Sequence, residues 1–378
     1  MAALRLHDGA DEQDDLHAQH ELRELLADAV KRGASDLHLE PIEGGYELRH
    51  RVDGLLEAVQ PLSAESGGSL VNRLMVAAQL LTYRRGVPQE GRVRVQIGAP
   101  GEQANETSKS LDLRLSIMPT THGLRAVVRL PAELYQPRSL ESLRLPDTVM
   151  MGLRRFIAAD SGMLILCGPA GSGKTTTMYA LLEAIVSYHP GQSVISLEDP
   201  VERQLQGITQ IEVQPFGELT FETVLRSVLR QDPQVLAIGE VRDAQTAAIA
   251  VGAALSGHRL VTSMHAASPE QALIRLIEMG IEPYQVASAL AGVVSMRLLR
   301  RGSDSVGYAG RTPIASYLSV DEAVRQALIE RADASTICTA AQRQAGWVSL
   351  QDHARSLVRA GVTDQPEVNR ALGAIMSD

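Results

Sequence analysis

Apolar and polar residues alternate along much of the first third of the chain, with the period of two that is typical of strands with one buried face. Ser35–Glu40 and Tyr46–Arg51 alternate in this way, and Val52-Asp53-Gly54 supplies a tight turn before a return strand at Leu55–Val59. Further strands are predicted at Val93–Ile97, Leu111–Ser116 and Leu124–Leu130, with a polar loop over 98–110. Helical spacing predicts helices over about 16–32 and about 67–82. These elements together predict a small α+β domain.

Beyond a proline-containing linker, short apolar runs alternate with segments of helical spacing. Strands are predicted at Met163–Cys167, Val194–Leu197, Val235–Ile238 and Leu260–Ser263. Such alternation favours an α/β fold in which helices cover a parallel sheet. From about residue 300 onward the pattern is mostly helical, with helices predicted at Val320–Arg331, Ala334–Ala345, Leu350–Ala360 and Pro366–Met376.

The stretch from Met163 to Thr177 predicts a phosphate-binding loop. A buried strand is followed by Gly168-Pro-Ala-Gly-Ser-Gly173 and then by a helix that begins at Lys174, which is the context that such a loop requires. Its backbone N–H groups would converge on phosphate oxygens at the positive end of a helix. Lys174 would reach the β- and γ-phosphates, and the Thr175 hydroxyl would ligate Mg²⁺. The alternative is a glycine-rich turn with a chance lysine. The residues expected to bind nucleotide are Gly168, Pro169, Ala170, Gly171, Ser172, Gly173, Lys174, Thr175 and Thr176.

Composition narrows the class of protein. The 378 residues suffice for two or three domains, and 44% hydrophobic with 21% charged residues is ordinary for a globular chain. A net charge of −9 and only 3% aromatic residues argue against a nucleic-acid partner, which needs a basic groove and stacking platforms. Cys167 and Cys338 have no zinc-ligand spacing, and the N-terminus lacks a signal-peptide pattern, so we expect a cytoplasmic chain.

Two acidic stretches follow predicted strands, at the edge where ligands bind in open α/β sheets. Glu198-Asp-Pro-Val-Glu202 places three carboxylates in five residues. These could hold Mg²⁺ indirectly or polarise an attacking water, although a solvated acidic turn is the alternative. Glu240 follows the apolar run Val235–Ile238, where an acid can orient a magnesium-bound water or the nucleophile.

Histidines and arginines supply further candidates. His258 and His265 bracket the strand Leu260–Ser263, and both a structural role and a role in sensing phosphate stay open. Arginine on a strand is usually solvated, but it can also neutralise charge on a transferring γ-phosphoryl group. The first domain carries six such residues on or beside its predicted strands, namely Arg49, Arg51, Arg92, Arg114, Arg125 and Arg129.

Taken together, these stretches resemble the secretion traffic ATPases, which drive type II secretion and type IV pilus assembly. The resemblance runs from about Ala34 to about Thr363. In the second half of the chain it rests on Gly168–Thr177 as the Walker A loop, Glu198–Glu202 as the Asp box, Leu229–Asp243 as the Walker B segment and Gly257–His265 as the His box. In the first half it rests on Ala34–Pro41, Arg51–Gly54, Pro88–Arg92 and Leu113–Gly123.

The resemblance implies a domain organisation and an assembly. It implies an acidic tail and helix at 1–33, a PAS-like domain at 34–133, a linker at 134–147, a RecA-like ATPase core at 148–300 and a helical C-terminal subdomain at 301–378. The chain would form a homohexamer that binds ATP and Mg²⁺ between the two domains. Their closing and opening would drive an inner-membrane platform protein, so the cytoplasmic chain would associate peripherally with that membrane.

The same resemblance implies roles for individual residues. Glu202 would be the general base for water, and Glu240 would be the partner of the magnesium-bound water. His258 and His265 would relay the nucleotide state, whereas Arg114 and Arg129 would reach the γ-phosphate. Many relatives carry a four-cysteine zinc insertion after the stretch that corresponds to Arg297–Arg301. This chain continues to Gly307–Thr312 without a cysteine, so we expect no zinc.

The leading prediction is an ATPase that powers assembly of a type IV pilus or of a type II secretion pseudopilus. A pilus retraction ATPase and a RecA-type ATPase that handles nucleic acid are the alternatives. A nucleotide-gated binding protein that no longer hydrolyses ATP is disfavoured, because Lys174, Glu202 and Glu240 are all retained.

Overall fold

The computed structural model describes residues 12–97, 109–131, 139–214, 217–303 and 307–373. The chain forms two compact units, Met1–Tyr135 and Gln136–Asp378, each with its own core. Much of the loop predicted over 98–110 lies outside the described residues, as does part of the linker.

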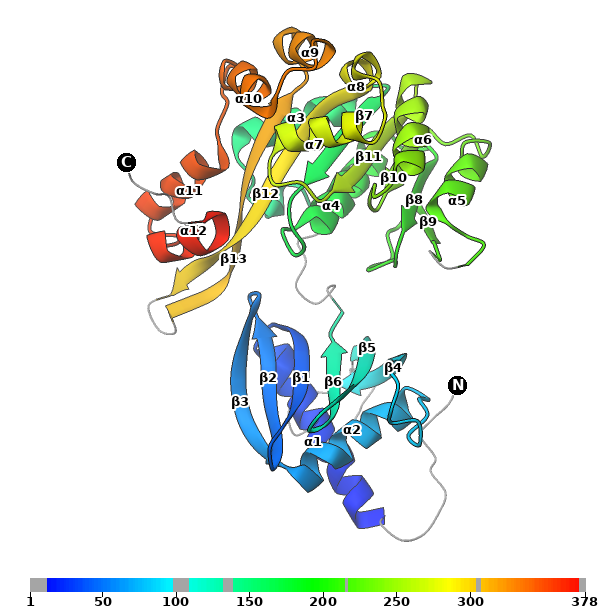
Figure 1. Ribbon diagram of the computed structural model, residues 1–378, viewed down its shortest axis with the longest axis vertical. Coiled ribbons are helices and arrows are strands. Elements are labelled where there is room, and N and C mark those ends of the chain that lie inside the picture. The colour runs from blue at the N-terminus through cyan, green and yellow to red at the C-terminus, as the bar shows by residue number, and fades with distance from the viewer. Residues whose placement is uncertain (1–11, 98–108, 132–138, 215–216, 304–306, 374–378) are drawn as a thin grey trace. The chain divides into compact units, whose positions relative to one another are not determined.

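The first unit is an antiparallel sheet with two helices on one face (Figure 1). The strands lie in the order β3-β2-β1-β6-β5-β4. Their side chains alternate between the helices α1 and α2 and the opposite face, so that Leu37, Leu48 and Leu113 enter the core. The elements are α1 (Glu12–Lys31), β1 (Ala34–Ile42), β2 (Gly45–Val52), β3 (Leu55–Ser63), α2 (Ala64–Ala77), β4 (Gln89–Ile97), β5 (Lys109–Thr120) and β6 (Gly123–Arg129).

The structure confirms the strands predicted for this unit, and it shortens the second helix. The Ser63 side chain caps the start of α2 by accepting a hydrogen bond from Ser66 N. The helix ends at Ala77 rather than near residue 82, because Gln79 takes a left-handed φ of 57°. Leu80 N then donates to Met75 O at 2.8 Å, which satisfies a carbonyl of the last turn.

The second unit is built on a seven-stranded sheet in the order β13-β12-β7-β11-β10-β8-β9. All neighbouring strands are parallel except β12 and β13, which confirms the predicted parallel sheet. The four predicted strands are β7 (Gly162–Cys167), β8 (Val194–Glu198), β10 (Val235–Ile238) and β11 (Arg259–Met264). Both faces of this sheet are buried, so these strands read as continuous apolar runs.

Helices cover both faces of this sheet. Leu164 and Leu166 of β7 pack with α3 (Asp147–Ala158) and α4 (Lys174–Tyr188), whereas Met163 and Ile165 face the opposite layer. The other helices are α5 (Phe221–Val228), α6 (Ala244–Leu255), α7 (Pro269–Glu278), α8 (Pro283–Ala289), α9 (Glu322–Ile329), α10 (Ala334–Gln342), α11 (Leu350–Arg359) and α12 (Gln365–Leu372). The last four confirm the helices predicted for the C-terminal part of the chain.

Three strands were not predicted, namely β9 (Thr209–Glu212), β12 (Leu290–Ser303) and β13 (Gly307–Ser319). The expectation that the chain is mostly helical from residue 300 was therefore wrong for β13, which forms the edge of the central sheet. Pro313 and Gly310 make β13 look unlike a strand in the sequence. An edge position tolerates proline, because the ladder on one side needs no N–H donor.

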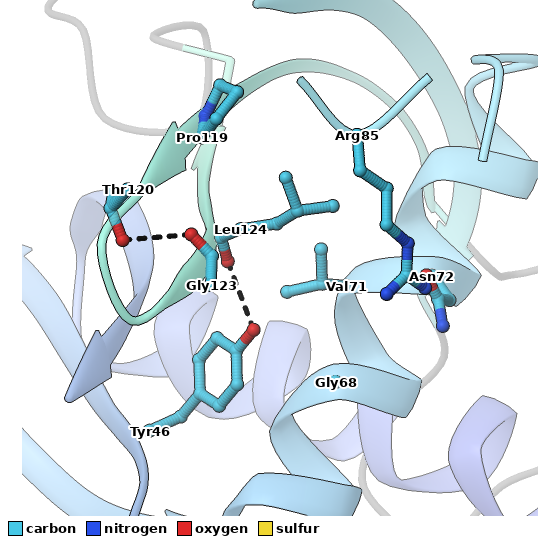
Figure 2. A pocket seen from close by; sticks show the side chains of 9 residues that line it. All are labelled: Tyr46, Gly68, Val71, Asn72, Arg85, Pro119, Thr120, Gly123 and Leu124. Carbon is cyan, nitrogen blue, oxygen red and sulfur yellow. Dashed lines mark hydrogen bonds between the residues drawn. The ribbon is translucent and has the colours of Figure 1, made fainter. Parts of the chain in front are cut away.

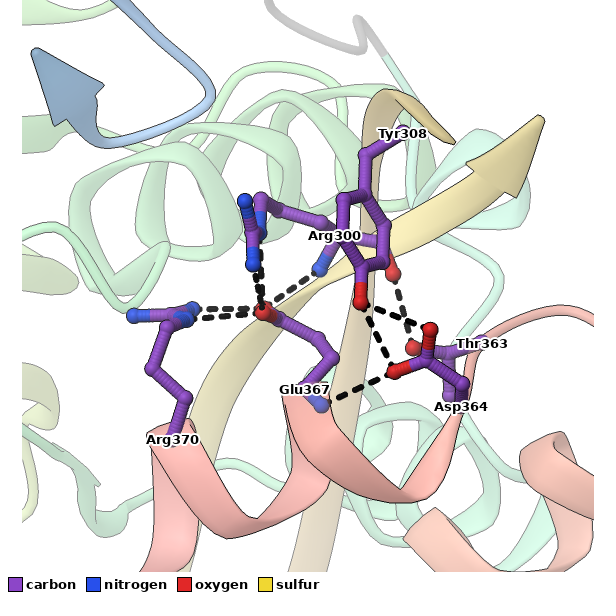
Figure 3. A network of polar contacts seen from close by, with 6 residues as sticks. All are labelled: Arg300, Tyr308, Thr363, Asp364, Glu367 and Arg370. Atoms are coloured by element: carbon purple, nitrogen blue, oxygen red, sulfur yellow. Dashed lines mark hydrogen bonds and ion pairs between the residues drawn. The ribbon is translucent and has the colours of Figure 1, made fainter. Parts of the chain in front are cut away.

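A buried carboxylate attaches α12 to the hairpin of β12 and β13 (Figure 3). Glu367 is fully buried and accepts hydrogen bonds from Arg300 N at 2.9 Å and Arg300 Nε at 2.8 Å. Arg370 Nε donates to the same carboxylate at 2.7 Å. Tyr308 on β13 donates to Asp364, which caps α12. The charged network and a small apolar cluster, to which α12 contributes Val368, together fix the C-terminal helix.

Candidate functional site

The phosphate loop lies where the sequence predicted it, between β7 and α4. Gly171 and Gly173 have left-handed φ values of 71° and 97°, which glycine adopts without strain. A Cβ on Gly168 would lie 2.6 Å from both Met296 O and Ser172 Oγ, so only glycine fits there. The Ser172 hydroxyl is buried and has no hydrogen-bond partner among the residues that the structure describes. This close-packed, polar loop at a helix N-terminus is suited to an anionic ligand.

Lys174 lies folded over this loop. Its side chain is only 9% exposed, and Nζ donates to Gly168 O at 2.8 Å and to Pro169 O at 2.9 Å. Burial lowers the pKa of Lys174, whereas the carboxylate of Glu240 opposes this shift. A cation held against two backbone carbonyls can exchange them for phosphate oxygens, which bind an ammonium group more strongly.

Glu240 lies at the tip of β10, between a histidine and an arginine. Its Oε1 is 3.2 Å from His265 Nε2, and its Oε2 accepts from Arg242 Nε at 2.9 Å. The side chain is 16% exposed. β10, β11 and β7 are parallel neighbours, so their carboxyl ends bring Glu240, His265 and the phosphate loop to one edge of the sheet. The structure thus places these predicted site residues together.

His258 is not part of this constellation. It precedes β11, and its carbonyl accepts from Gly162 N at the beginning of β7. His258 and His265 are seven residue steps apart along the extended chain of β11, which at about 3.3 Å per residue is about 23 Å. The ring Nδ1 of His258 lies 3.0 Å from Ala253 O. The two histidines therefore lie at opposite ends of one strand, and the structure does not bring His258 to the phosphate loop.

The three carboxylates of the acidic stretch have different environments. Glu198, the last residue of β8, is 4% exposed and accepts from Ser196 Oγ at 2.6 Å and Gln210 Nε2 at 3.0 Å. It is fully engaged within the protein, so a solvated turn does not describe it. Asp199 is exposed, and Glu202 is partly exposed on the loop that follows. Of the three, Glu202 combines partial shielding with access from solvent.

Sequence reasoning missed Tyr179, which joins this loop to α4. Tyr179 is 1% exposed, and its hydroxyl donates to Glu198 Oε2. The same hydroxyl accepts a hydrogen bond from Glu202 N at 3.1 Å. No pattern in the sequence signals this contact, because a tyrosine on the buried face of a helix resembles any core aromatic.

Three of the arginines predicted on the strands of the first unit share one sheet face. Strand register pairs Arg92 with Arg114 and Arg114 with Arg129, so these three side chains form a row across β4, β5 and β6. The row continues to Asp36, whose buried carboxylate accepts from Arg129 Nε at 2.9 Å. The helices α1 and α2 pack on the other face of the sheet, so these arginines project from the face opposite the core of the first unit.

The described residues also contain features outside this constellation. A cavity of about 230 Å³ in the first unit lies between α2 and the turn of β5 and β6 (Figure 2). Its polar contacts are Tyr46 OH to Leu124 O at 3.2 Å and Arg85 Nη2 to Asn72 Oδ1 at 3.0 Å. No carboxylate or histidine lines it, so we assign it no chemistry. No helix in the described part of the chain is long and apolar enough to cross a bilayer.

Comparison with known proteins identifies the family. The sequence profile of the family described as "Type II/IV secretion system protein" matches residues 11–370. This chain belongs to that family. It is an ATPase, in agreement with its phosphate loop and with the ATPases among its relatives.

Several relatives resemble the ATPase over most of its length. It is 34% identical to "Type II secretion system protein HxcR" of Pseudomonas aeruginosa, covering 95% of this chain and 78% of the relative. It is likewise 34% identical to "Type II secretion system ATPase E" of Vibrio cholerae, covering 95% and 76%. Identity to "Type IV pilus assembly ATPase PilB" of Thermus thermophilus is 32%, covering 94% of this chain but 43% of that protein.

Solved structures agree with the fold. The ATPase DotB of Legionella pneumophila matches with a TM-score of 0.74 at 20% identity, covering 93% of this chain and 95% of that chain. The pilus retraction motor PilT matches with a TM-score of 0.63 at 24% identity, covering 92% and 96%. At these identities the likeness concerns the α/β fold.

Proposed function

We propose that this ATPase works as a homohexameric motor for assembly of a type IV pilus or a type II secretion pseudopilus. In this proposal it acts at the cytoplasmic side of the inner membrane, through a platform protein. The relatives named for type II secretion and pilus assembly support this choice. The observation that carries it is the phosphate loop with Lys174, Glu240 and His265 gathered at one sheet edge. The first unit is proposed to be PAS-like and the second RecA-like, with a helical C-terminal part.

The residues around the loop fit a nucleotide with Mg²⁺. The glycine cradle, the unpartnered Ser172 hydroxyl and the folded-back Lys174 offer donors for phosphate oxygens. Thr175, exposed on the first turn of α4, would hold Mg²⁺ directly, and Glu240 would hold it through water. When bound, Mg²⁺ would neutralise charge on the phosphate oxygens. Within the described residues no cluster of three or more acidic, histidine or cysteine side chains forms a metal centre, which agrees with a magnesium site built largely from water and phosphate.

The proposed chemistry is hydrolysis of the terminal phosphoanhydride. Glu202 accepts a proton from the water that attacks the γ-phosphorus, and the bond to ADP breaks to give ADP and phosphate. Glu202 fits this role because, of the three carboxylates in Glu198–Glu202, it alone is partly shielded without being fully buried or fully exposed. His265 is proposed to report the nucleotide state through its contact with Glu240. Arg114 and Arg129 are proposed to stabilise charge on the γ-phosphate.

The proposal is tested by measuring the ATPase rate against protein concentration, with the mass followed by light scattering. We expect turnover per chain to rise as hexamers form. Lys174→Ala should abolish turnover and weaken binding of MgATP, whereas Glu202→Gln should bind MgATP normally and lose turnover by about 100-fold or more. Hydrolysis at full rate by a stable monomer would contradict the ring, and normal turnover by Glu202→Gln would contradict the assignment of the base.

A further inference from the structure

Tyr179 occupies an unusual position on α4, the helix that begins at the phosphate loop. It lies on the buried side of that helix, and its hydroxyl meets the carboxyl end of β8 rather than packing among apolar groups only. One hydroxyl makes two directed contacts there, as donor to Glu198 and as acceptor from Glu202 N. Burial and the adjacent Glu198 carboxylate raise the pKa of Tyr179, so the hydroxyl keeps its proton and stays a donor.

A second contact ties the same loop to the same helix. Arg203 Nη1 and Nη2 donate to the two carboxylate oxygens of Glu183 at 3.0 and 3.1 Å. The Arg203 side chain is 10% exposed, and its guanidinium lies 5.6 Å from the centre of the Tyr179 ring. Glu183 follows Tyr179 by one helical turn, so both side chains lie on one face of α4. A bidentate, shielded pair of this kind fixes direction as well as distance.

These contacts hold the backbone on both sides of the Glu202 side chain. Its own N–H is bound to Tyr179, and the next side chain is bound to Glu183. Glu198, at the beginning of the loop, is bound to Tyr179 and is further fixed by Ser196 and Gln210. Because α4 also carries Lys174 at its first position, one rigid helix connects the loop of Glu202 to the phosphate loop.

We propose that Tyr179 is a positioning residue for ATP hydrolysis, whose hydroxyl holds the main chain of Glu202 at a fixed place relative to the phosphate loop. This inference rests on the proposed role of Glu202 as general base. A general base must lie within hydrogen-bond reach of the proton that it accepts, so a small displacement of its backbone lowers the rate of the chemical step. Phenylalanine would fill the same space but could neither donate to Glu198 nor accept from Glu202 N.

The test is Tyr179→Phe, with Tyr317→Phe as the matched control. Tyr317 of β13 is partly buried in the second unit, at the opposite side of the sheet from β8, and its hydroxyl donates to Ala291 O at 3.4 Å. For Tyr179→Phe we expect kcat to fall by about tenfold or more, with KM and the dissociation constant of MgATP within about twofold of the parent. The Glu202 amide should exchange with deuterium at least about fivefold faster. Tyr317→Phe should change none of these quantities.

The outcomes separate this inference from the proposed function. If Glu202→Gln loses turnover and Tyr179→Phe keeps it, the positioning role of Tyr179 is wrong while the assignment of the base stands. If Glu202→Gln keeps its turnover, both fail. If Tyr179→Phe lowers MgATP affinity and kcat together, or if Tyr317→Phe has the same effect, then the hydroxyl serves general stability and the inference is overturned.

Discussion

Two buried cationic side chains of the second unit, Lys174 and Arg259, differ in whether their N–H groups are hydrogen-bonded. Lys174 is shielded yet donates to two carbonyls of the loop that it serves. Arg259 is 1% exposed at the beginning of β11, and its Nε and Nη1 have no hydrogen-bond partner among the described residues. Burial lowers the pKa of Arg259, and only the charge of Asp160 opposes this shift. The first arrangement is suited to ligand binding, whereas the second imposes a cost on folding.

We therefore expect Arg259→Met to leave stability unchanged or to raise it. Methionine fills a similar volume without burying unpaired N–H groups, so the free energy of unfolding should increase by up to about 2 kcal/mol. Thermal unfolding followed by tryptophan fluorescence measures this, because the only tryptophan of the chain, Trp347, lies in the second unit. Arg154→Met, at a side chain that is 64% exposed, is the control and should have no effect. A clear loss of stability in Arg259→Met alone would show that the guanidinium makes a favourable contact.

At the scale of single elements, the attachment of a helix can depend on hydrogen bonds of a buried charged group. The helix α12 is attached to β12 in part by the buried carboxylate of Glu367. Burial would raise the pKa of Glu367, but hydrogen bonds from Arg370 and Arg300 outweigh it and lower the pKa to about 2. The folded-state pKa is thus below the ordinary value of 4.5. The stability that this carboxylate contributes is present above pH 4.5 and is lost as the pH falls from about 4.5 to about 2.

The expected consequence is a pH-dependent difference between the parent and Glu367→Gln. The variant should be less stable at neutral pH by about 3 kcal/mol at most, and this difference should shrink as the pH falls from 5 toward 3. Urea unfolding at several pH values measures it. Glu322→Gln, at an exposed side chain on α9, serves as the control. A difference that stays constant with pH would mean that the variant acts through packing rather than through the lost charge.

At the scale of the whole molecule, the two units have separate cores. The core of the first unit contains residues from both helices and from the sheet, all within Met1–Tyr135. A core closed within one segment is the physical condition for independent folding. Apart from Arg114 and Arg129, the residues proposed for ATP chemistry lie on or beside β7, β8, β10, β11 and α4, which all belong to the second unit.

A fragment of residues 1–135 should therefore unfold cooperatively by itself. Far-UV circular dichroism during heating should show a single transition. Leu74→Ala, at a fully buried position on α2, should lower the free energy of unfolding of the fragment by about 2–5 kcal/mol. Val76→Ala, at an exposed position on the same helix, should change this free energy by much less. A gradual, non-cooperative loss of signal in the parent fragment would contradict the prediction.

Hydrophobic periodicity and local motifs were sufficient for most elements and for the phosphate loop. Strands such as β10 and helices such as α4 are specified by contiguous residues, and the loop needs glycines in fixed order before Lys174. These features depend on backbone conformation and on the spacing of neighbouring residues, so they can be predicted from the sequence alone. The parallel sheet was likewise predicted from the alternation of helices and strands, and the family from the ordered motifs, whereas the order of the strands was not predicted.

The tertiary structure alone decided which polar residues meet. Local sequence pattern does not show that Glu198 and Glu202 differ in burial, but packing buries the first against Tyr179 and leaves the second partly exposed. His258 and His265 are close in sequence, but an extended strand carries them to opposite ends of the sheet. The strand β13 joins the sheet although it contains glycine and proline. It lies at the edge, where a strand has a hydrogen-bonded neighbour on one side only and tolerates a residue without an N–H group. These outcomes depend on contacts between segments far apart in the chain, and local pattern carries no information about them.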